Sequence, residues 1–217
     1  MRLYTNHERG DMQTTTVSGG PRSWDLYLFD MGNVVIEGIT VIEKIAEYYH
    51  LEYEELLDDY KKYEFPLMDG AIDSDVYWDH VEERFSVRVE KDPLAIFFKP
   101  YWNAPVVQIL TSLKSAGKRV VCASNTYAPH WEYLDREGYF FIFDKVYASH
   151  ELKVTKPSRQ FFERILTEEH ADAENTLFID DYLINVSAAR ALGMTAFHYD
   201  KKSNKDIDRD LASFLGV

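Results

Sequence analysis

Five short apolar segments recur along the chain, and three of them stop at a polar residue. The clearest are 26–29 before Asp30, 120–123 before Ser124, 176–179 before Asp180 and 195–199 after Gly193, and a weaker one covers 145–148. Nearly continuous apolar runs of this length are typical of strands that are buried on both faces of a parallel sheet. The pattern therefore predicts a parallel sheet in the interior of the protein.

Segments with helical periodicity lie between these runs. Apolar residues recur three or four positions apart at Val106, Leu110 and Leu113, at Phe161, Phe162, Ile165 and Leu166, and at Leu183, Val186 and Ala189. Strands that alternate with helices in this way are characteristic of open α/β folds. We expect an α/β protein with a Rossmann-like, doubly wound parallel sheet as its core.

Residues 40–102 interrupt this alternation with a helical, acidic and aromatic segment. One apolar stripe joins Ile42, Ile45 and Tyr49, and a second joins Val76, His80 and Val81. We interpret this segment as a small helical cap inserted after the first strand. The predicted division is a flexible tail over 1–23, an α/β core over 24–39 and 103–217, and the helical cap over 40–102.

The composition of the chain limits the cellular compartment and the binding partners that we expect for it. The chain has 217 residues, of which 46% are hydrophobic, and a formal net charge of −13, which disfavours binding to nucleic acids and to anionic membranes. No apolar run approaches the roughly 18 residues of a membrane span, and the beginning of the chain lacks the layout of a signal peptide. With Cys122 as its single cysteine, the protein is expected in a reducing compartment, the cytoplasm.

Polar residues follow three of the predicted strands directly. Asp30, the pair Ser124 and Asn125, and the pair Asp180 and Asp181 take these positions, although the first two lie far apart in the sequence. Ligands bind at the carboxyl edge of open parallel sheets, so we expect these side chains to converge there. A fourth candidate, Lys156, precedes Pro157 and a predicted helix.

The converging groups indicate phosphate chemistry that depends on a metal. Three neighbouring carboxylates repel one another unless a cation lies among them, and oxygen ligands of this kind suit Mg²⁺. A lysine and small polar donors can hold a phosphate, while one carboxylate attacks phosphorus. Taken singly, each of these residues is more often a turn or capping residue, so the argument rests on the ordered set.

The ordered set resembles a known family. Phe29-Asp-Met-Gly-Asn-Val-Val35, Ala123-Ser-Asn-Thr126, Lys156-Pro157 and Phe178-Ile-Asp-Asp181 with Asn185 are similar to the four motifs of the haloacid dehalogenase superfamily, in order and spacing. The insertion resembles the small cap of the first subfamily. Within that subfamily, the chain looks most like the sugar phosphatases typified by α-glucose-1-phosphate phosphatase.

The resemblance implies a role for each motif residue in the hydrolysis of a small phosphate ester, which in this branch is expected to be a sugar phosphate, with Mg²⁺ as cofactor. The nucleophile and a metal ligand would be Asp30, and the carbonyl of Gly32 a second ligand. The phosphoryl group would be bound by Ser124 and Asn125, with Lys156 neutralising its charge and that of Asp30. Asp180 and Asp181 are both candidate ligands of Mg²⁺; the spacing from Asp181 to Asn185 favours Asp181 as the direct ligand, and Asp180 and Asn185 would then orient the metal and its waters.

One position departs from the family pattern. Most phosphatases of the superfamily carry a second Asp two residues after the nucleophile, where it protonates the leaving group, and this chain has Gly32 there. A water or a cap residue is then left to supply the proton. Two other functions stay open: a metal-independent 2-haloacid dehalogenase that uses Asp30 on carbon, and a catalytically inactive binding or regulatory protein.

Overall fold

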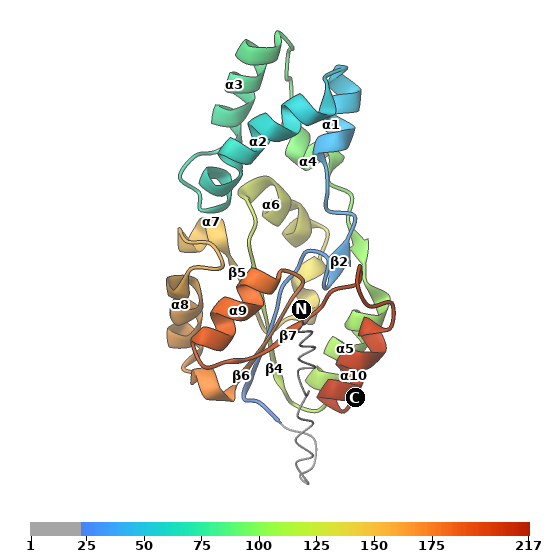
Figure 1. Ribbon diagram of the computed structural model, residues 1–217, viewed down its shortest axis with the longest axis vertical. Coiled ribbons are helices and arrows are strands. Elements are labelled where there is room, and N and C mark those ends of the chain that lie inside the picture. The colour runs from blue at the N-terminus through green and yellow to red at the C-terminus, as the bar shows by residue number, and fades with distance from the viewer. Residues whose placement is uncertain (1–22) are drawn as a thin grey trace, which may run out of the picture.

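The protein is built around a five-stranded parallel sheet, described here from a computed structural model that covers residues 23–217 (Figure 1). Its strands run in the order β5-β4-β1-β6-β7. They are β1 (Leu26–Phe29), β4 (Arg119–Ser124), β5 (Lys145–Ala148), β6 (Thr176–Asp180) and β7 (Thr195–His198). The predicted α/β fold and all five predicted strands are confirmed, whereas the predicted tail lies outside the described residues except for Ser23.

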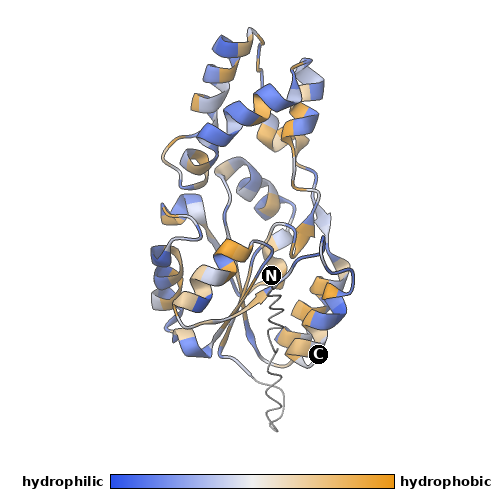
Figure 2. Ribbon diagram, in the orientation of Figure 1, coloured by the Kyte–Doolittle hydropathy of each residue, from blue (hydrophilic) through white to orange (hydrophobic). Residues whose placement is uncertain are grey.

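Side chains of successive strand residues pack on opposite faces of the sheet. In β1, Leu26 and Leu28 belong to one hydrophobic cluster, and Tyr27 and Phe29 belong to the other. The first cluster includes α8 (Arg159–Glu169) and α9 (Leu183–Ala191), and the second includes α5 (Ala104–Ser115) and α10 (Ile207–Leu215). Figure 2 shows the apolar residues concentrated along the strands and on the helix faces that cover them. The sheet is therefore covered on both sides, as a doubly wound fold requires.

Residues 40–102 form four helices at one end of the elongated molecule (Figure 1). They are α1 (Ile42–Tyr49), α2 (Tyr53–Met68), α3 (Ser74–Phe85) and α4 (Pro93–Phe97). The chain enters and leaves this segment through a short antiparallel ribbon, β2 (Ile36–Glu37) with β3 (Tyr101–Trp102). Asn103 fixes the ribbon to the core, because its side chain donates hydrogen bonds to the carbonyl of Val34 (2.7 Å) and the hydroxyl of Tyr199 (2.8 Å).

The remaining elements connect the strands. They are α6 (Ala128–Arg136), α7 (Ser149–Leu152) and two 3₁₀ turns, η1 (Tyr139–Ile142) and η2 (Ala173–Asn175). Within residues 23–217, no helix is long and apolar enough to cross a membrane.

Two residues assigned to apolar stripes from the sequence lie on the surface instead. Val76 is 52% exposed, because α3 turns Tyr77, Trp78 and Val81 inward and so buries a stripe shifted by one residue. Leu183 is 56% exposed in the first turn of α9, although Val186 and Ala189 of the same stripe are fully buried. These two expectations were wrong, and the exposure of Leu183 matters for the site described next.

Candidate active site

The carboxyl ends of the three central strands bring the predicted site residues together. β1 lies between β4 and β6, and Phe29 pairs in register with Cys122 on one side and Ile179 on the other. The residue that follows, Asp30, donates its backbone N–H to the carbonyl of Ile179 (2.9 Å). Carboxylate oxygens of Asp30, Asp180 and Asp181 lie within 4.8 Å of one another.

A buried lysine neutralises part of this negative charge. The Nζ of Lys156 lies 2.8 Å from Asp30 Oδ1 and 2.8 Å from Asp180 Oδ2, and it donates to the carbonyl of Ala123 at 2.9 Å. Burial alone would lower the pKa of Lys156, but the charges of Asp180 and Asp30 outweigh it and raise that pKa, so the ammonium stays charged. The lysine therefore supplies a fixed positive charge beside Asp30.

The two motif-four aspartates have different surroundings. Asp180 is fully buried and accepts hydrogen bonds from Lys156, from the backbone N–H of Tyr182 (2.7 Å) and from Asn185, whose Nδ2 lies 3.1 Å from each carboxylate oxygen. Asp181 is only partly buried, and the side chain that donates a hydrogen bond to its carboxylate is that of Asn33 (3.0 Å). Asp181 thus keeps free oxygen lone pairs that Asp180 has already used within the protein.

The pKa values reflect the crowding of these carboxylates. Burial raises the pKa of Asp30 to about 7 against the charge of Lys156, and the charges of Asp180 and Asp181 raise it further. Burial and the charge of Asp180 likewise raise the pKa of Asp181, although the hydrogen bond from Asn33 opposes them. A cation among the three would favour the ionised forms. A cluster of carboxylate oxygens is a fitting set for a hard divalent cation such as Mg²⁺.

Ser124 and Asn125 occupy the end of β4, but their side chains differ in availability. The Asn125 side chain holds the backbone of Lys156 from both sides, since its Oδ1 accepts from the N–H (2.8 Å) and its Nδ2 donates to the carbonyl (2.9 Å). Ser124 is buried, and within residues 23–217 its hydroxyl donates only one hydrogen bond, a long one of 3.4 Å to the carbonyl of Asn125. Asn125 therefore positions Lys156, and the Ser124 hydroxyl is the freer of the two for a ligand.

Gly32, which departs from the family pattern, lies in the loop after β1. Backbone N–H groups of Val35 and Ile36 donate to the carbonyl of Met31, so the chain turns tightly after Asp30. Asn33 has a φ of 55°, in the left-handed region, and its side chain reaches Asp181. Gly32, in contrast, is not among the residues with positive φ, so its backbone does not require glycine.

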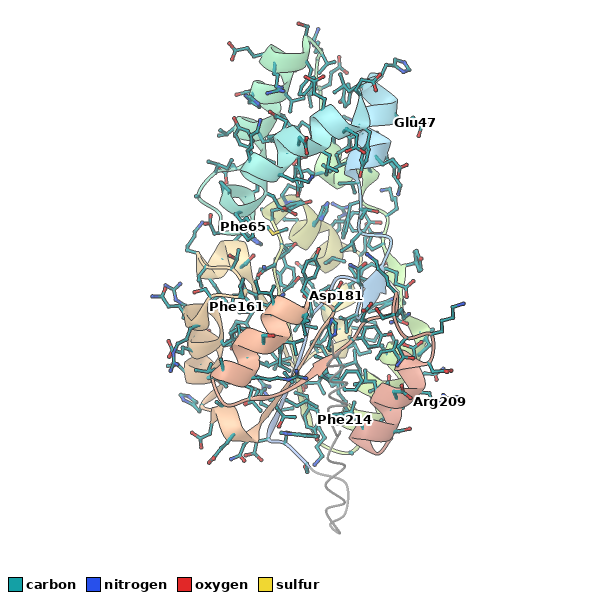
Figure 3. All side chains as sticks on the ribbon, in the orientation of Figure 1. Glu47, Phe65, Phe161, Asp181, Arg209 and Phe214 are labelled. Carbon is teal, nitrogen blue, oxygen red and sulfur yellow. The ribbon has the colours of Figure 1, made fainter. Side chains whose placement is uncertain are left out.

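Two polar residues near the site had no signal in the sequence. Asn33 is one, and Ser149 is the other: its Oγ accepts the N–H of Thr126 (2.9 Å) and donates to the carbonyl of Met68 (2.5 Å). Ser149 therefore joins the loop after β4 to the end of α2. In Figure 3, Asp181 lies at the end of the core that faces the helices of residues 40–102, and Phe65 lies at the end of α2 nearest the core.

These features agree with what comparison with known proteins finds. The chain belongs to the haloacid dehalogenase-like hydrolases, because the model of that family matches residues 24–193. Its fold is similar to that of BT-2542, a family enzyme from Bacteroides thetaiotaomicron solved in complex with magnesium and inorganic phosphate. That likeness has a TM-score of 0.71 at 21% identity and covers 84% of this chain and 97% of the other.

Relatives of higher identity match only parts of the chain. Over 97 residues it is 35% identical to the sesquiterpene phosphatase astK of Aspergillus oryzae (44% of this chain, 50% of that protein). Over 111 residues it is 32% identical to the drimenol cyclase drtB of Aspergillus calidoustus (51% and 21%). Over 114 residues it is 30% identical to the glyceraldehyde 3-phosphate phosphatase of Methanocaldococcus jannaschii (52% and 49%). The chain thus spans half or less of the length of these relatives.

Proposed function

We propose that this protein is a magnesium-dependent phosphatase that hydrolyses a small phosphate monoester through an aspartyl phosphate on Asp30. The observation that carries the proposal is the group of three carboxylates with Lys156 between two of them, at the carboxyl edge of the sheet. Such a group combines a nucleophile, a fixed cation and oxygen ligands for a metal. The phosphatases among the relatives support the same reaction class.

In the proposed reaction, an Asp30 oxygen attacks phosphorus while the bond from phosphorus to the alcohol oxygen breaks. Lys156 offsets the charge of Asp30 and of the phosphoryl oxygens, and Ser124 donates a hydrogen bond to one of those oxygens, with Asn125 holding Lys156 in place. A water then attacks the phosphorus of the aspartyl phosphate, which releases inorganic phosphate and restores the Asp30 carboxylate.

Bound Mg²⁺ would lower the repulsion between the phosphate and the aspartates. Asp30, Asp181 and the carbonyl of Gly32 would hold the ion, and Asp181 is the better direct ligand of the motif-four pair because its oxygens are less used. Asp180 keeps its place through Asn185 and Lys156, so these residues position the site and do not bind the ion.

The charge of the site favours this reaction over metal-free dehalogenation. A dehalogenase that attacks carbon needs Asp30 as nucleophile but gains nothing from two further carboxylates beside it. An inactive binding protein would have no need for a lysine that joins Asp30 to Asp180 at 2.8 Å on each side. We also propose that residues 24–39 and 103–217 form an α/β core domain and that residues 40–102 form a cap. In this proposal the cap helices close the site over the substrate.

Two substrate classes fit this site. A sugar phosphate agrees with the branch that the motifs resemble, and the net charge of −13 favours a small molecule over nucleic acid. A terpenoid phosphate is the second candidate, because Tyr182, Leu183 and Ile184 are 63%, 56% and 62% exposed directly after Asp181. Three adjacent exposed apolar side chains beside a charged site can hold an apolar alcohol group, and one relative is a sesquiterpene phosphatase.

The test is phosphate release by the purified protein from 4-nitrophenyl phosphate, glucose 1-phosphate and farnesyl phosphate. We expect turnover with Mg²⁺ and its loss in EDTA, since Lys156 alone cannot offset three carboxylates and a phosphate. Asp30→Asn should reduce kcat by several orders of magnitude with an unchanged circular dichroism spectrum. Full activity in EDTA, or in Asp30→Asn, would refute the proposed reaction, and the ranking of kcat/KM decides between the two substrate classes.

A further inference from the structure

The leaving alcohol lacks a proton donor on the loop after β1. Gly32 has no side chain, and a Cβ built there would lie 2.7 Å from Cδ1 of Ile39, so the space beside this glycine is taken by an apolar group. An alcohol that departs without a proton is a poor leaving group, and general acid catalysis typically contributes about 10²–10⁴-fold. Another element that faces the site is therefore the place to look for the acid.

Glu64 lies on the stripe of α2 that faces the core. Residues four positions apart share one side of a helix, and Leu56 and Tyr60, which precede Glu64 on this stripe, are buried. The Tyr60 hydroxyl lies 3.3 Å from the hydroxyl of Tyr127, in the loop after β4, and the Met68 carbonyl accepts a hydrogen bond from Ser149. Glu64 is partly buried and lies between these two contacts, on the part of α2 that packs against the loop after β4.

The charge of Glu64 acts on tyrosines in two of the loops that form the site. Burial raises the pKa of Tyr182, and the charges of Asp181 and Glu64 are the next largest causes. Burial also raises the pKa of Tyr127, where a hydrogen bond from Tyr60 opposes it and the charge of Glu64 adds to it. Coulomb interactions weaken with distance, and both effects agree with the position of Glu64 one turn after the Tyr60–Tyr127 contact.

The carboxyl of Glu64 is free to act as a donor. Within residues 23–217 it forms no hydrogen bond and no ion pair, although the residue is partly buried. Burial raises its pKa, and the nearby charge of Lys61 opposes the shift only in part. The other titratable groups near it are the hydroxyls of Tyr60, Tyr127 and Tyr182. A partly buried carboxyl without a partner retains its proton more readily than the aqueous group does.

We propose that Glu64, carried by α2, is the general acid and base of the reaction that Asp30 initiates. As the bond from phosphorus to the alcohol oxygen breaks, the Glu64 carboxyl gives its proton to that oxygen and the alcohol leaves neutral. The Glu64 carboxylate then takes a proton from the water that attacks the aspartyl phosphate, which returns it to its starting form. This inference rests on the proposed phosphatase function.

The experiment compares two aryl phosphates of nearly equal shape, phenyl phosphate and 4-nitrophenyl phosphate. Nitrophenolate leaves readily without a proton and phenolate does not, and kcat/KM covers the steps up to release of the phenol. We expect Glu64→Gln to lower kcat/KM about 10²-fold for phenyl phosphate and by less than about fivefold for 4-nitrophenyl phosphate. Glu54→Gln, on the exposed side of the same helix, should leave both values unchanged.

The pH dependence gives a second readout that a merely structural role would not change. The ratio of the two kcat/KM values cancels ionisations that both substrates share, including that of Asp30. In the wild type this ratio of phenyl to nitrophenyl phosphate should fall as the pH rises through the pKa of Glu64, and in Glu64→Gln it should be flat.

Three outcomes would overturn the inference. An equal loss for both substrates would assign Glu64 a packing role, and no loss for either would remove it from the reaction; in both cases the hydrolysis of 4-nitrophenyl phosphate by the wild type leaves the phosphatase function standing. A wild type that hydrolyses neither ester would refute the phosphatase function itself, and the inference with it.

Discussion

Lys156 is the residue on which the electrostatics of the site depend. It is 1% exposed and lies in contact with two carboxylates that are themselves buried. Taking such charges out of water costs several kcal/mol per ion, and that cost is offset only while each charge keeps its partner. The residue that we propose prepares Asp30 for attack should therefore also keep the centre of the sheet folded.

Replacing this lysine should cost stability as well as activity. We expect Lys156→Met to lower the free energy of unfolding by about 3–5 kcal/mol at pH 7.5 in EDTA, because two buried carboxylates lose their cation. The measurement is urea denaturation. Lys61→Met is the matched control, since its pairing with Asp58 is exposed to solvent and should contribute at most about 1 kcal/mol. If Lys156→Met lowers the free energy of unfolding by less than about 1 kcal/mol, the contacts of Lys156 with Asp30 and Asp180 do not stabilise the fold.

Among the secondary-structure elements, the strands of the central sheet could be predicted from the sequence, because they are buried on both faces. The five strands are mainly apolar because helices cover both faces of the sheet, and this leaves a clear pattern in the sequence. Their carboxyl ends meet by topology alone, so Asp30, Ser124 and Asp180 could be expected to converge. The ribbon β2–β3, in contrast, has two residues per strand and is too short for any periodicity.

The residues that the sequence did not indicate are those set by contacts between elements. Asn33 reaches Asp181 because of its left-handed backbone, and Ser149 joins α2 to the loop after β4. Glu64 stands among many acidic residues of the same segment, and only the packing of α2 against the core distinguishes it. No spacing rule within one element can show which helix side will meet another element.

His130 is a further packing contact between elements, and it predicts a pH effect on stability. Its ring stacks on Phe98 with centroids 3.7 Å apart, and burial lowers its pKa to about 3 from 6.5, against the hydrogen bond with the backbone of Leu94. The unfolded chain thus binds a proton below pH 6.5 that the folded one does not bind until about pH 3. Stability from this residue is complete above pH 6.5 and is lost as the pH falls.

The prediction is tested by urea denaturation at pH 7.5 and pH 5.0. Between these two pH values, protonation of His130 in the unfolded state should lower the free energy of unfolding of the wild type by about 2 kcal/mol. In His130→Phe the free energy of unfolding should fall by about 2 kcal/mol less than in the wild type. His50→Asn, at an exposed left-handed position that asparagine tolerates, should keep the wild-type dependence. If His130→Phe loses as much stability as the wild type, the ring is not held neutral in the fold.

For the whole molecule, the site lies where the core meets the inserted helices. The sheet brings the carboxylates to one edge, and the end of α2 is held against that edge through Ser149 and Tyr127. In the proposed reaction, the groups that attack the phosphate belong to the core, and the groups that meet the alcohol come from the insertion. On this proposal, variation in the insertion would change the substrate without changing the nucleophile.

Because the net charge is −13, cations should stabilise the whole molecule. The site predicts that part of this stabilisation is specific to Mg²⁺. Any salt screens the repulsion between surface charges, whereas an ion bound only by the folded state adds about 2.7 kcal/mol at a hundred times its Kd. For a chain of this length, that corresponds to a rise in Tm of roughly 5–10 °C.

We therefore expect MgCl₂ to raise the Tm measured by circular dichroism well above the value in NaCl of equal ionic strength. Asp181→Asn should lose most of this difference, because the amide keeps the shape but removes the charge of the most available ligand. Asp79→Asn removes the same charge from an exposed position on α3 and should keep the full difference. The readout needs no substrate, so it separates metal binding from catalysis. Equal shifts in the two salts, or a full Mg²⁺ shift in Asp181→Asn, would show that the three carboxylates do not hold the ion.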